Sequence, residues 1–268
     1  MKKSIRTHFE LTGPYHSLCR EERNLCAVLY HLLLSNPENL PLFLKTIGRE
    51  PAKLDNSEIY VEYAQLRDIW HAFGKNKPSE VENETRREFI LDSLNLQSRE
   101  DLRKLSVQEF NKVFVARTSP SSQVIESPSN WSIKQLDKSF PDDSGGSKGF
   151  LQAARFKWCF NVKPDIVIFL SDDEAVSIEA KFESSEGKYP SGGEEWKIFQ
   201  RRGLQKVPQT EIQKQVFRLL GIDATHVLLA KKGGGDGHFT WTEVFRALNV
   251  DQESRFIKEQ IESFLKKC

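Results

Sequence analysis

Two strand-like segments joined by a short acidic turn constrain the fold of this chain more than any other feature of its sequence. The first, Asp165–Leu170 (DIVIFL), is a β-branched apolar run of the kind found in central strands buried on both faces. The second, Ala175–Phe182 (AVSIEAKF), alternates, with Val176, Ile178, Ala180 and Phe182 directed inward and Ser177, Glu179 and Lys181 outward. The intervening SDDE predicts a tight turn, so the two segments are expected to form an antiparallel hairpin.

Further segments extend this hairpin into an α/β fold. Residues 15–35 carry apolar side chains at helical spacing and predict a first helix. The alternating segment Ala154–Asn161 (ARFKWCFN) predicts a strand before the hairpin, which would complete a three-stranded meander. Thr210–Leu220 predicts a helix that ends at Gly221, and Thr225–Ala230 (THVLLA) predicts another buried strand. Two terminal helices are expected at about 240–248 and 252–266.

A long insertion separates the first helix from the predicted meander. Its clearest pieces are all expected to be helical: Leu40–Ile47, Val61–Phe73, Glu80–Leu94 and Val107–Val115. From Thr118 to Gly149 the sequence is rich in Ser, Pro, Asp and Gly, which predicts loops or a partly disordered connector. We therefore expect three regions: a first core helix (1–39), a mostly helical region that recognises substrate or a partner (40–150), and a core that contains the hairpin (151–268).

Composition excludes several classes of protein. The 268 residues are 38% hydrophobic and carry a net charge of +1, which argues against a wholly disordered chain and against a generic polycation that binds nucleic acid by bulk charge. No apolar run approaches the roughly 18 residues of a membrane-spanning helix, and the basic N-terminus lacks the apolar region of a secretory signal. The cysteines lack metal-site spacing and are expected to be free thiols in a cytoplasmic protein: Cys19, Cys26, Cys159 and Cys268.

Three charged side chains are expected to converge at one end of the hairpin. Asp165 begins one strand, and the two-residue period of the next strand places Glu179 and Lys181 on the same face. Two neighbouring carboxylates repel each other unless a positive charge lies between them. Mg²⁺ binds one or two carboxylates together with phosphate oxygens, and a nearby lysine can orient or deprotonate a water. This combination of groups suits the hydrolysis of a phosphodiester.

The pair Pro164-Asp165, followed after the hairpin turn by Glu179-Ala180-Lys181, resembles the signature of the PD-(D/E)xK nuclease superfamily. The resemblance covers the first helix and residues about 150–231. It implies a restriction-endonuclease-like core, which runs helix, three-stranded meander, helix and strand. It also implies that Asp165 and Glu179 bind Mg²⁺, for which Mn²⁺ can substitute, and that the main-chain carbonyl of Ala180 can join them. Lys181 would position the attacking water, and the products would carry 5′-phosphate and 3′-hydroxyl ends.

Two helices carry further candidates for this site. Glu22 falls within the apolar stripe of the first helix, where relatives often place an acidic residue near the metal. An ion pair with Arg20 or Arg23 at the rim of the core is an equally good interpretation. On the helix at 210–220, Gln213 is the first candidate and Gln209 the second for a contact with the scissile phosphate or its water, as relatives imply. The alternative is that both glutamines are ordinary solvated side chains.

Charge is segregated along the chain around the hairpin. Residues 172–195 contain eight acidic and two basic residues, a net charge of −6, whereas residues 196–232 contain eight basic and two acidic residues, a net charge of +6. A basic segment beside an acidic metal site suits a polyanionic substrate. The nucleic-acid-binding candidates are Arg201, Arg202, Lys206 and Lys214. The alternative is a solvated helix face.

These observations predict a Mg²⁺-dependent nuclease, with DNA as the expected substrate and a restriction, defence or repair role. Two alternatives stay open: a nucleic-acid-binding module on the same fold that does not cleave, and an interaction protein whose hairpin charges are incidental. A homodimer is also open, since relatives that cut both strands are commonly dimers. The glycine-rich loop at 233–238 has neither the spacing nor the ending of a phosphate-binding loop, so no nucleotide cofactor is expected.

Overall fold

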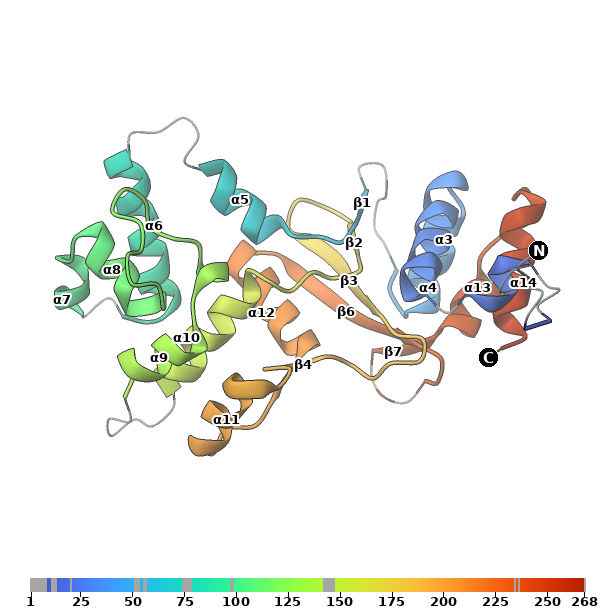
Figure 1. Ribbon diagram of the computed structural model, residues 1–268. Coiled ribbons are helices and arrows are strands. Elements are labelled where there is room, and N and C mark those ends of the chain that lie inside the picture. The colour runs from blue at the N-terminus through green and yellow to red at the C-terminus, as the bar shows by residue number, and fades with distance from the viewer. Residues whose placement is uncertain are drawn as a thin grey trace, which may run out of the picture.

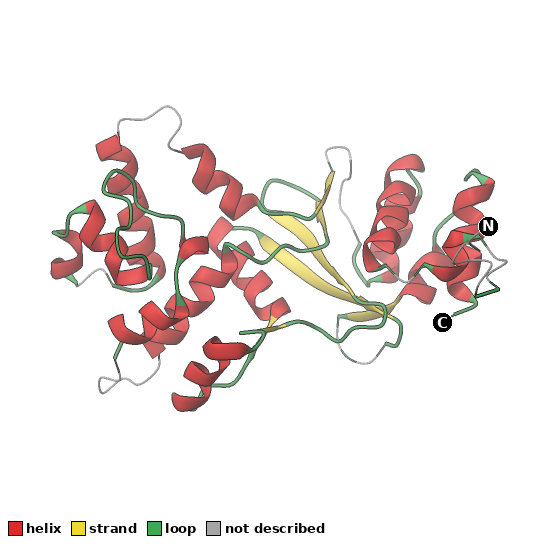
Figure 2. Cartoon of the chain, viewed as in Figure 1, coloured by secondary structure: helices red, strands yellow, loops and turns green. Residues whose placement is uncertain are grey.

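The computed structural model shows a central β-sheet between two groups of helices (Figure 1). It describes residues 9–10, 14–19, 21–50, 54, 57–73, 79–96, 99–141, 148–233, 235 and 237–267. Figure 2 shows that the strands lie together in the middle of the molecule and that helices make up most of the remainder. The chain is therefore an α/β protein, as the sequence predicts.

The sheet is mixed and has its strands in the order β1-β2-β3-β6-β7. These strands are β1 (Glu58–Val61), β2 (Ile166–Phe169), β3 (Glu174–Ala180), β6 (Asp223–Ala230) and β7 (His238–Thr240). The first three form an antiparallel meander, whereas β3 pairs with β6, and β6 with β7, in parallel. The parallel step from β3 to β6 needs a crossover, which contains α12 (Gln209–Leu220). The predicted hairpin, helix and following strand are all confirmed.

Helices cover both faces of this sheet. One face packs on α3 (Glu22–Ser35), α4 (Asn39–Thr46), α13 (Trp241–Ala247) and α14 (Arg255–Leu265), which share an apolar core with Ile166, Val176 and Ile178. On the other face, Phe217 of α12 packs on Val167 and Ala175. Ser177 and Glu179 are each only 1% exposed as a result. The prediction that these side chains face outward is therefore wrong, because they do not reach solvent: α12 covers them.

A second apolar core lies within a group of helices beside the sheet. This group contains α5 (Gln65–Phe73), α6 (Ser79–Ser93), α7 (Glu100–Arg103), α8 (Val107–Phe114), η2 (Pro128–Asn130), α9 (Ile133–Ser139), α10 (Lys148–Cys159) and α11 (Gly193–Arg201). Trp131 stacks on Phe114 with ring centroids 4.2 Å apart. The helical character expected for much of residues 40–150 is confirmed.

The predicted strand at 154–161 is wrong, because these residues belong to helix α10 and the turn after it. Phe156, Trp158 and Phe160 are buried, but so is Cys159, which the alternating pattern places on the opposite face. The helix packs against η2, α9 and α12, so it is buried on more than one side. A helix surrounded in this way does not keep one polar face, and a short alternating window then imitates a strand.

The third strand of the meander is instead β1. It lies before the predicted helix Val61–Phe73 and overlaps it only at Val61. Val61 ends this strand, and helix α5 begins only at Gln65. β1 pairs with β2 through the register Val61↔Ile166. The segment 62–165, which holds most of the helical group, is therefore inserted between two neighbouring strands of the meander.

The predicted loop region at 118–149 is partly ordered by side-chain amides. Asn111 Nδ2 donates hydrogen bonds of 2.9 Å to the carbonyl oxygens of Ser121 and Val124. Asn83 Oδ1 accepts from the N–H of Ile125 at 2.7 Å. Helix α9 follows within the same region. Residues 118–141 therefore do not form a disordered connector. Residues 142–147 lie outside the described residues.

Candidate active site

Asp165 and Glu179 lie side by side at one end of the sheet. Asp165 immediately precedes β2, and Glu179 is the penultimate residue of β3. The register pairs Ile166 with Ile178, which sets Asp165 opposite Glu179. Asp165 Oδ2 accepts a hydrogen bond of 2.7 Å from the N–H of Ala180. The hairpin register therefore brings together the two carboxylates that lie 14 positions apart in the sequence.

Lys181 completes this group from the residue after β3. Its Nζ lies 2.5 Å from Glu179 Oε1 and 2.8 Å from the main-chain oxygen of Ala180. The backbone of Lys181 is fixed on both sides, since its N–H donates to the carbonyl of Leu229 and its carbonyl accepts from Trp241 Nε1 at 2.9 Å. The lysine side chain is only 14% exposed, so its ammonium group is held inside the site.

Glu22 also reaches the site, from the first turn of α3. Its Oε2 accepts hydrogen bonds from the N–H of Phe182 at 2.7 Å and from Ser184 Oγ at 2.9 Å. Its Oε1 lies 3.7 Å from Lys181 Nζ. Arg23, one of the two arginines considered as its partner, pairs instead with Glu62 at 3.6 Å; Arg20 lies outside the described residues. Glu22 is therefore part of the Lys181 cluster.

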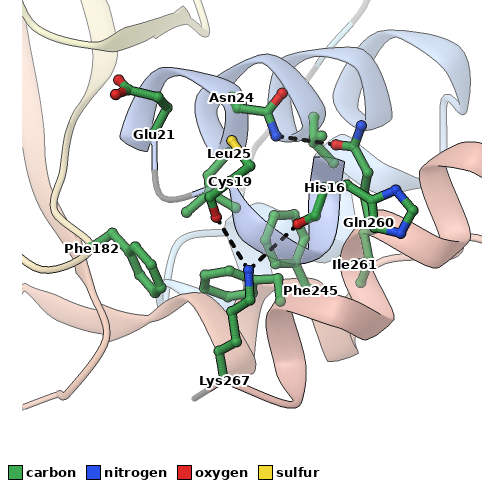
Figure 3. A pocket seen from close by; sticks show the side chains of 12 residues that line it. His16, Cys19, Glu21, Asn24, Leu25, Phe182, Phe245, Gln260, Ile261 and Lys267 are labelled. Carbon is green, nitrogen blue, oxygen red and sulfur yellow. Dashed lines mark hydrogen bonds between the residues drawn. The ribbon is translucent and has the colours of Figure 1, made fainter. Parts of the chain in front are cut away.

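The start of α3 is held in place by the C-terminal helix, in a small pocket between them (Figure 3). Asn24 Nδ2 donates to Gln260 Oε1 at 3.2 Å. Lys267 Nζ donates to the carbonyl of Cys19 at 3.2 Å, and this carbonyl belongs to the residue after α2 (Tyr15–Leu18). Phe182, whose N–H binds Glu22, lines the same pocket. Packing of α14 thus fixes the position from which Glu22 reaches Lys181.

Two glutamines of α12 bind Glu179 from the opposite side. Gln209 Nε2 lies 2.9 Å from both carboxylate oxygens, and Gln213 Nε2 lies 2.6 Å from Oε2. They are one helical turn apart, which places both on the same face of α12. Gln213 is 1% exposed, and Gln209 is partly buried with its amide on Glu179, so the interpretation of the two residues as ordinary solvated side chains is wrong. Both glutamines fix the orientation of the Glu179 carboxylate.

Burial and mutual repulsion make the two carboxyl groups hard to ionise. Burial raises the pKa of Asp165, although the Ala180 N–H and Lys181 act in the opposite direction. Burial and the charge of Asp165 likewise raise the pKa of Glu179. Burial would lower the pKa of Lys181, but its hydrogen bond to Glu179 and the nearby negative charges raise it overall. Lys181 is therefore held as an ammonium ion, and its single positive charge does not balance the negative charge of both carboxylates.

The sequence patterns missed one acidic neighbour, Glu62. It follows β1, and its N–H donates to the main-chain oxygen of Asp165 at 3.0 Å. Its charge contributes to the raised pKa of Asp165, and its carboxylate lies 3.7 Å from Lys163 Nζ. The predicted helix Val61–Phe73 includes Glu62, although the segment EIYV before it forms a strand. The β-branched and aromatic residues of this segment were the signal that could have placed Glu62 at the end of a strand.

The donor atoms of the site suit a hard cation, with one condition. Among the described residues, no group of three His, Cys, Asp or Glu side chains is arranged to hold a metal ion. Two carboxylates and one main-chain carbonyl are all oxygen donors, as Mg²⁺ prefers. The Lys181 ammonium, however, contacts both Glu179 and the Ala180 carbonyl. The residues therefore fit Mg²⁺ if the side chain of Lys181 moves away from these two oxygens.

The four basic candidates for substrate binding differ in their exposure. Arg201 is 68% exposed and Lys214 is 43% exposed, each with one ion-pair partner. Lys206 Nζ donates to the carbonyl of Ser191 and lies over the ring of Trp196. The side chain of Arg202 is only 7% exposed; it binds Asp137 and lies over the ring of Phe150, 4.3 Å from its centroid. Arg202 therefore joins α9 to α11 and has little surface to offer a substrate.

We predict that Arg202→Ala destabilises the fold by about 3 kcal/mol, because it removes a buried guanidinium that binds the Asp137 carboxylate and the main-chain oxygen of Phe140 and packs on Phe150. Arg201→Ala is the matched control, since Arg201 binds the same carboxylate from an exposed position and its loss costs about 0.5 kcal/mol or less. Urea unfolding of both variants measures the difference. Equal stability of the two variants would contradict the structural role of Arg202.

Comparison of the chain with protein-family models, with curated proteins and with solved structures finds no match. Among the described residues, no helix is long and apolar enough to cross a membrane. Cys19, Cys26 and Cys159 are free thiols. The function of the chain therefore has to be argued from its site.

Proposed function

We propose that the chain is a Mg²⁺-dependent nuclease of the PD-(D/E)xK type that acts on DNA as an endonuclease. The observation that carries this proposal is the meeting of Asp165, Glu179 and Lys181 at one end of the sheet, where Asp165 and Lys181 are hydrogen-bonded to the Ala180 backbone and Lys181 also contacts Glu179. The order of elements α3, β1, β2, β3, α12 and β6 also agrees with a restriction-endonuclease-like core.

In this proposal, Asp165, Glu179 and the Ala180 carbonyl would hold the metal ion, and Glu22 would support it from helix α3, where it lies near Lys181. Bound Mg²⁺ would polarise the scissile phosphate and acidify the attacking water. Gln209 and Gln213 keep the Glu179 carboxylate in one orientation. Because the pKa of Lys181 is raised, its ammonium donates hydrogen bonds at neutral pH. Lys181 thus orients the water and stabilises negative charge as it develops on the phosphate.

The substrate would approach from the α12 side of the sheet. Lys214 follows Gln213 directly and is partly exposed, so it is our first candidate for a contact with a backbone phosphate. Arg201 and Lys206 are further candidates, whereas Arg202 is omitted because it is buried. The free thiols agree with a reducing, cytoplasmic environment.

A substrate panel tests this function. The protein is incubated with supercoiled, linear and single-stranded DNA and with RNA, in Mg²⁺, Mn²⁺ or EDTA. We expect cleavage of DNA with either metal ion and none in EDTA. Cleavage of RNA in place of DNA would contradict the proposed substrate but not the proposed active site. Cleavage that persists in EDTA would contradict the proposed chemistry.

A non-cleaving nucleic-acid-binding module is the second candidate. The observation that favours it is the complete satisfaction of Glu179, which accepts hydrogen bonds from Lys181, Gln209 and Gln213 without any metal ion. This candidate predicts DNA binding that is the same in Mg²⁺ and in EDTA, together with intact DNA after prolonged incubation.

We predict that Mg²⁺ or Mn²⁺ raises the melting temperature, and more so at pH 8 than at pH 5. Ligand at 100 times its Kd stabilises a protein by roughly 2.7 kcal/mol. Because the pKa values of Asp165 and Glu179 are raised, protons compete with the metal ion at pH 5. Thermal unfolding at the two pH values, with and without metal, measures this. A metal-induced shift that is larger at pH 5 would contradict binding at these carboxylates.

A further inference from the structure

The free edge of the sheet carries a feature that the proposed nuclease site does not use. β1 is the first strand in the sheet order and pairs with β2 along one side only (Figure 1). Tyr60 is 43% exposed and Val61 is 46% exposed. Edge strands present backbone groups that can pair with another chain, and proteins usually cover or charge them. An exposed edge strand of this kind is a place where a partner strand can be added.

The register of β1 identifies which backbone groups face outward. The N–H of Glu62 donates to the main-chain oxygen of Asp165, so this pair faces inward toward β2. Inward and outward residues alternate in an antiparallel ladder, which places the N–H and C=O groups of Ile59 and Val61 at the free edge. Among the described residues, none donates to or accepts from these groups at that edge.

A groove runs beside this edge and is larger than small-molecule pockets usually are. Its volume is about 1270 Å³, and small-molecule pockets measure roughly 300–1,000 Å³. Tyr60, Tyr63 and Phe169 give it an aromatic wall, with ring centroids 5.6 to 6.0 Å apart. A wide, partly aromatic groove along a sheet edge suits an extended polypeptide, whose alternate side chains would point into it.

The charge of the groove decides what kind of polymer fits. The described residues that line it include no Lys or Arg, and its acidic residues are Glu58, Glu62, Asp68 and Asp172. Glu62 and Asp68 have basic partners, but Glu58 and Asp172 have no ion pair among the described residues. Both lie at the end where Glu58 pairs with Phe169. Phosphates would be repelled there, and Lys or Arg side chains would be attracted.

We propose that β1 and this groove bind an extended basic segment of a partner protein, which pairs with β1 as an added antiparallel or parallel strand. Alternate Lys or Arg side chains of that segment lie near Glu58 and Asp172. A second copy of this chain fits less well, because pairing β1 with itself would bring two acidic grooves together. The N–H groups of Glu62 and Tyr63 bind the segment Pro164-Asp165, so the partner lies next to the candidate active site. The proposal does not depend on nuclease activity.

Peptide binding to the full-length protein tests this proposal. The probes are two fluorescent eight-residue peptides, one alternating lysine and valine and one alternating glutamate and valine. We expect the lysine peptide to bind at least tenfold more tightly, and we expect salt to weaken it. Equal affinity of the two peptides, or binding of neither, would overturn the proposal.

Val61→Pro provides the sharpest variant, because it removes an outward N–H while leaving the inward ladder to β2 intact. We expect at least a tenfold loss of affinity for the lysine peptide with an unchanged circular-dichroism spectrum. Asp172→Lys, in an exposed turn, should weaken binding without any backbone change, and Asp92→Lys on the exposed face of α6 is its control. Unchanged affinity in both Val61→Pro and Asp172→Lys would overturn the proposal.

Two further measurements test the alternative occupants of this groove, which are nucleic acid and a second copy of the chain. Binding of a single-stranded oligonucleotide that is lost in Val61→Pro would assign the groove to nucleic acid and overturn the proposal. A dimer in sedimentation velocity that Val61→Pro dissociates would assign it to a second copy of the chain, with the same consequence.

Discussion

Asp165→Asn is expected to abolish metal-dependent cleavage and to leave a protein at least as stable as the wild type. The amide can still accept the hydrogen bond from the Ala180 N–H, so the local geometry is kept. It cannot supply the negative charge that a cation needs. The loss of roughly 4 kcal/mol of transition-state stabilisation corresponds to about a thousandfold lower rate.

The stability effect of Asp165→Asn follows from the direction of the pKa shift. The pKa of Asp165 is higher in the folded protein than in the unfolded chain, chiefly through burial. Its stabilising contribution is therefore present below the unfolded pKa of about 3.9 and is lost as the pH rises through the folded value. At pH 7, a neutral amide at this position avoids the free-energy cost of burying an ionised carboxylate. A variant that loses activity because it unfolds would melt below the wild type without metal, and that outcome would contradict our interpretation.

Lys181→Ala is expected to lower the cleavage rate by about 10²- to 10⁴-fold, in the range of lost acid–base groups. Its effect on metal binding should be opposite to that of Asp165→Asn. The Lys181 ammonium contacts Glu179 Oε1 and the Ala180 carbonyl, both of which the metal ion would use. Removing the side chain frees these oxygens, so the rise in melting temperature on adding Mg²⁺ should be larger than in the wild type.

Lys188→Ala is the matched control for Lys181→Ala. Glu186-Gly187-Lys188 has the same acidic–small–lysine spacing as Glu179-Ala180-Lys181, but Lys188 is exposed on the short strand β4 (Lys188–Tyr189). Its loss should leave both cleavage and the metal-induced shift unchanged. If Lys188→Ala impaired cleavage as strongly as Lys181→Ala, the assignment of the lysine would be wrong.

The sequence predicted those parts of the site that depend on short-range patterns. The hairpin of β2 and β3 has an apolar run, an alternating run and a turn, so its register and the pairing of Asp165 with Glu179 follow directly. The apolar stripe of α12 likewise indicated which side Gln213 occupies. The sequence did not show whether the glutamines of α12 contact Glu179 or solvent, because these hydrogen bonds depend on how closely α12 packs on β3.

The errors arose where tertiary packing overrides a local pattern. Helix α10 is buried on several sides and therefore lacks the single polar face by which a helix is recognised. β1 has four residues and gains its stability from pairing with β2, which lies more than 100 positions away in the sequence. Glu62 was missed for the same reason, since its approach to Asp165 depends on that distant pairing. Arg202 is charged, but its burial could not be read from composition.

The central claim is that Asp165, Glu179 and Lys181 form a metal-dependent site for phosphodiester hydrolysis. Its most direct test compares wild type and Asp165→Asn on supercoiled plasmid, first in EDTA and then after Mg²⁺ is added in excess. We predict that the wild type leaves the plasmid intact in EDTA and nicks or linearises it once Mg²⁺ is added, while Asp165→Asn leaves it intact throughout. Equal cleavage by the two proteins would contradict the claim.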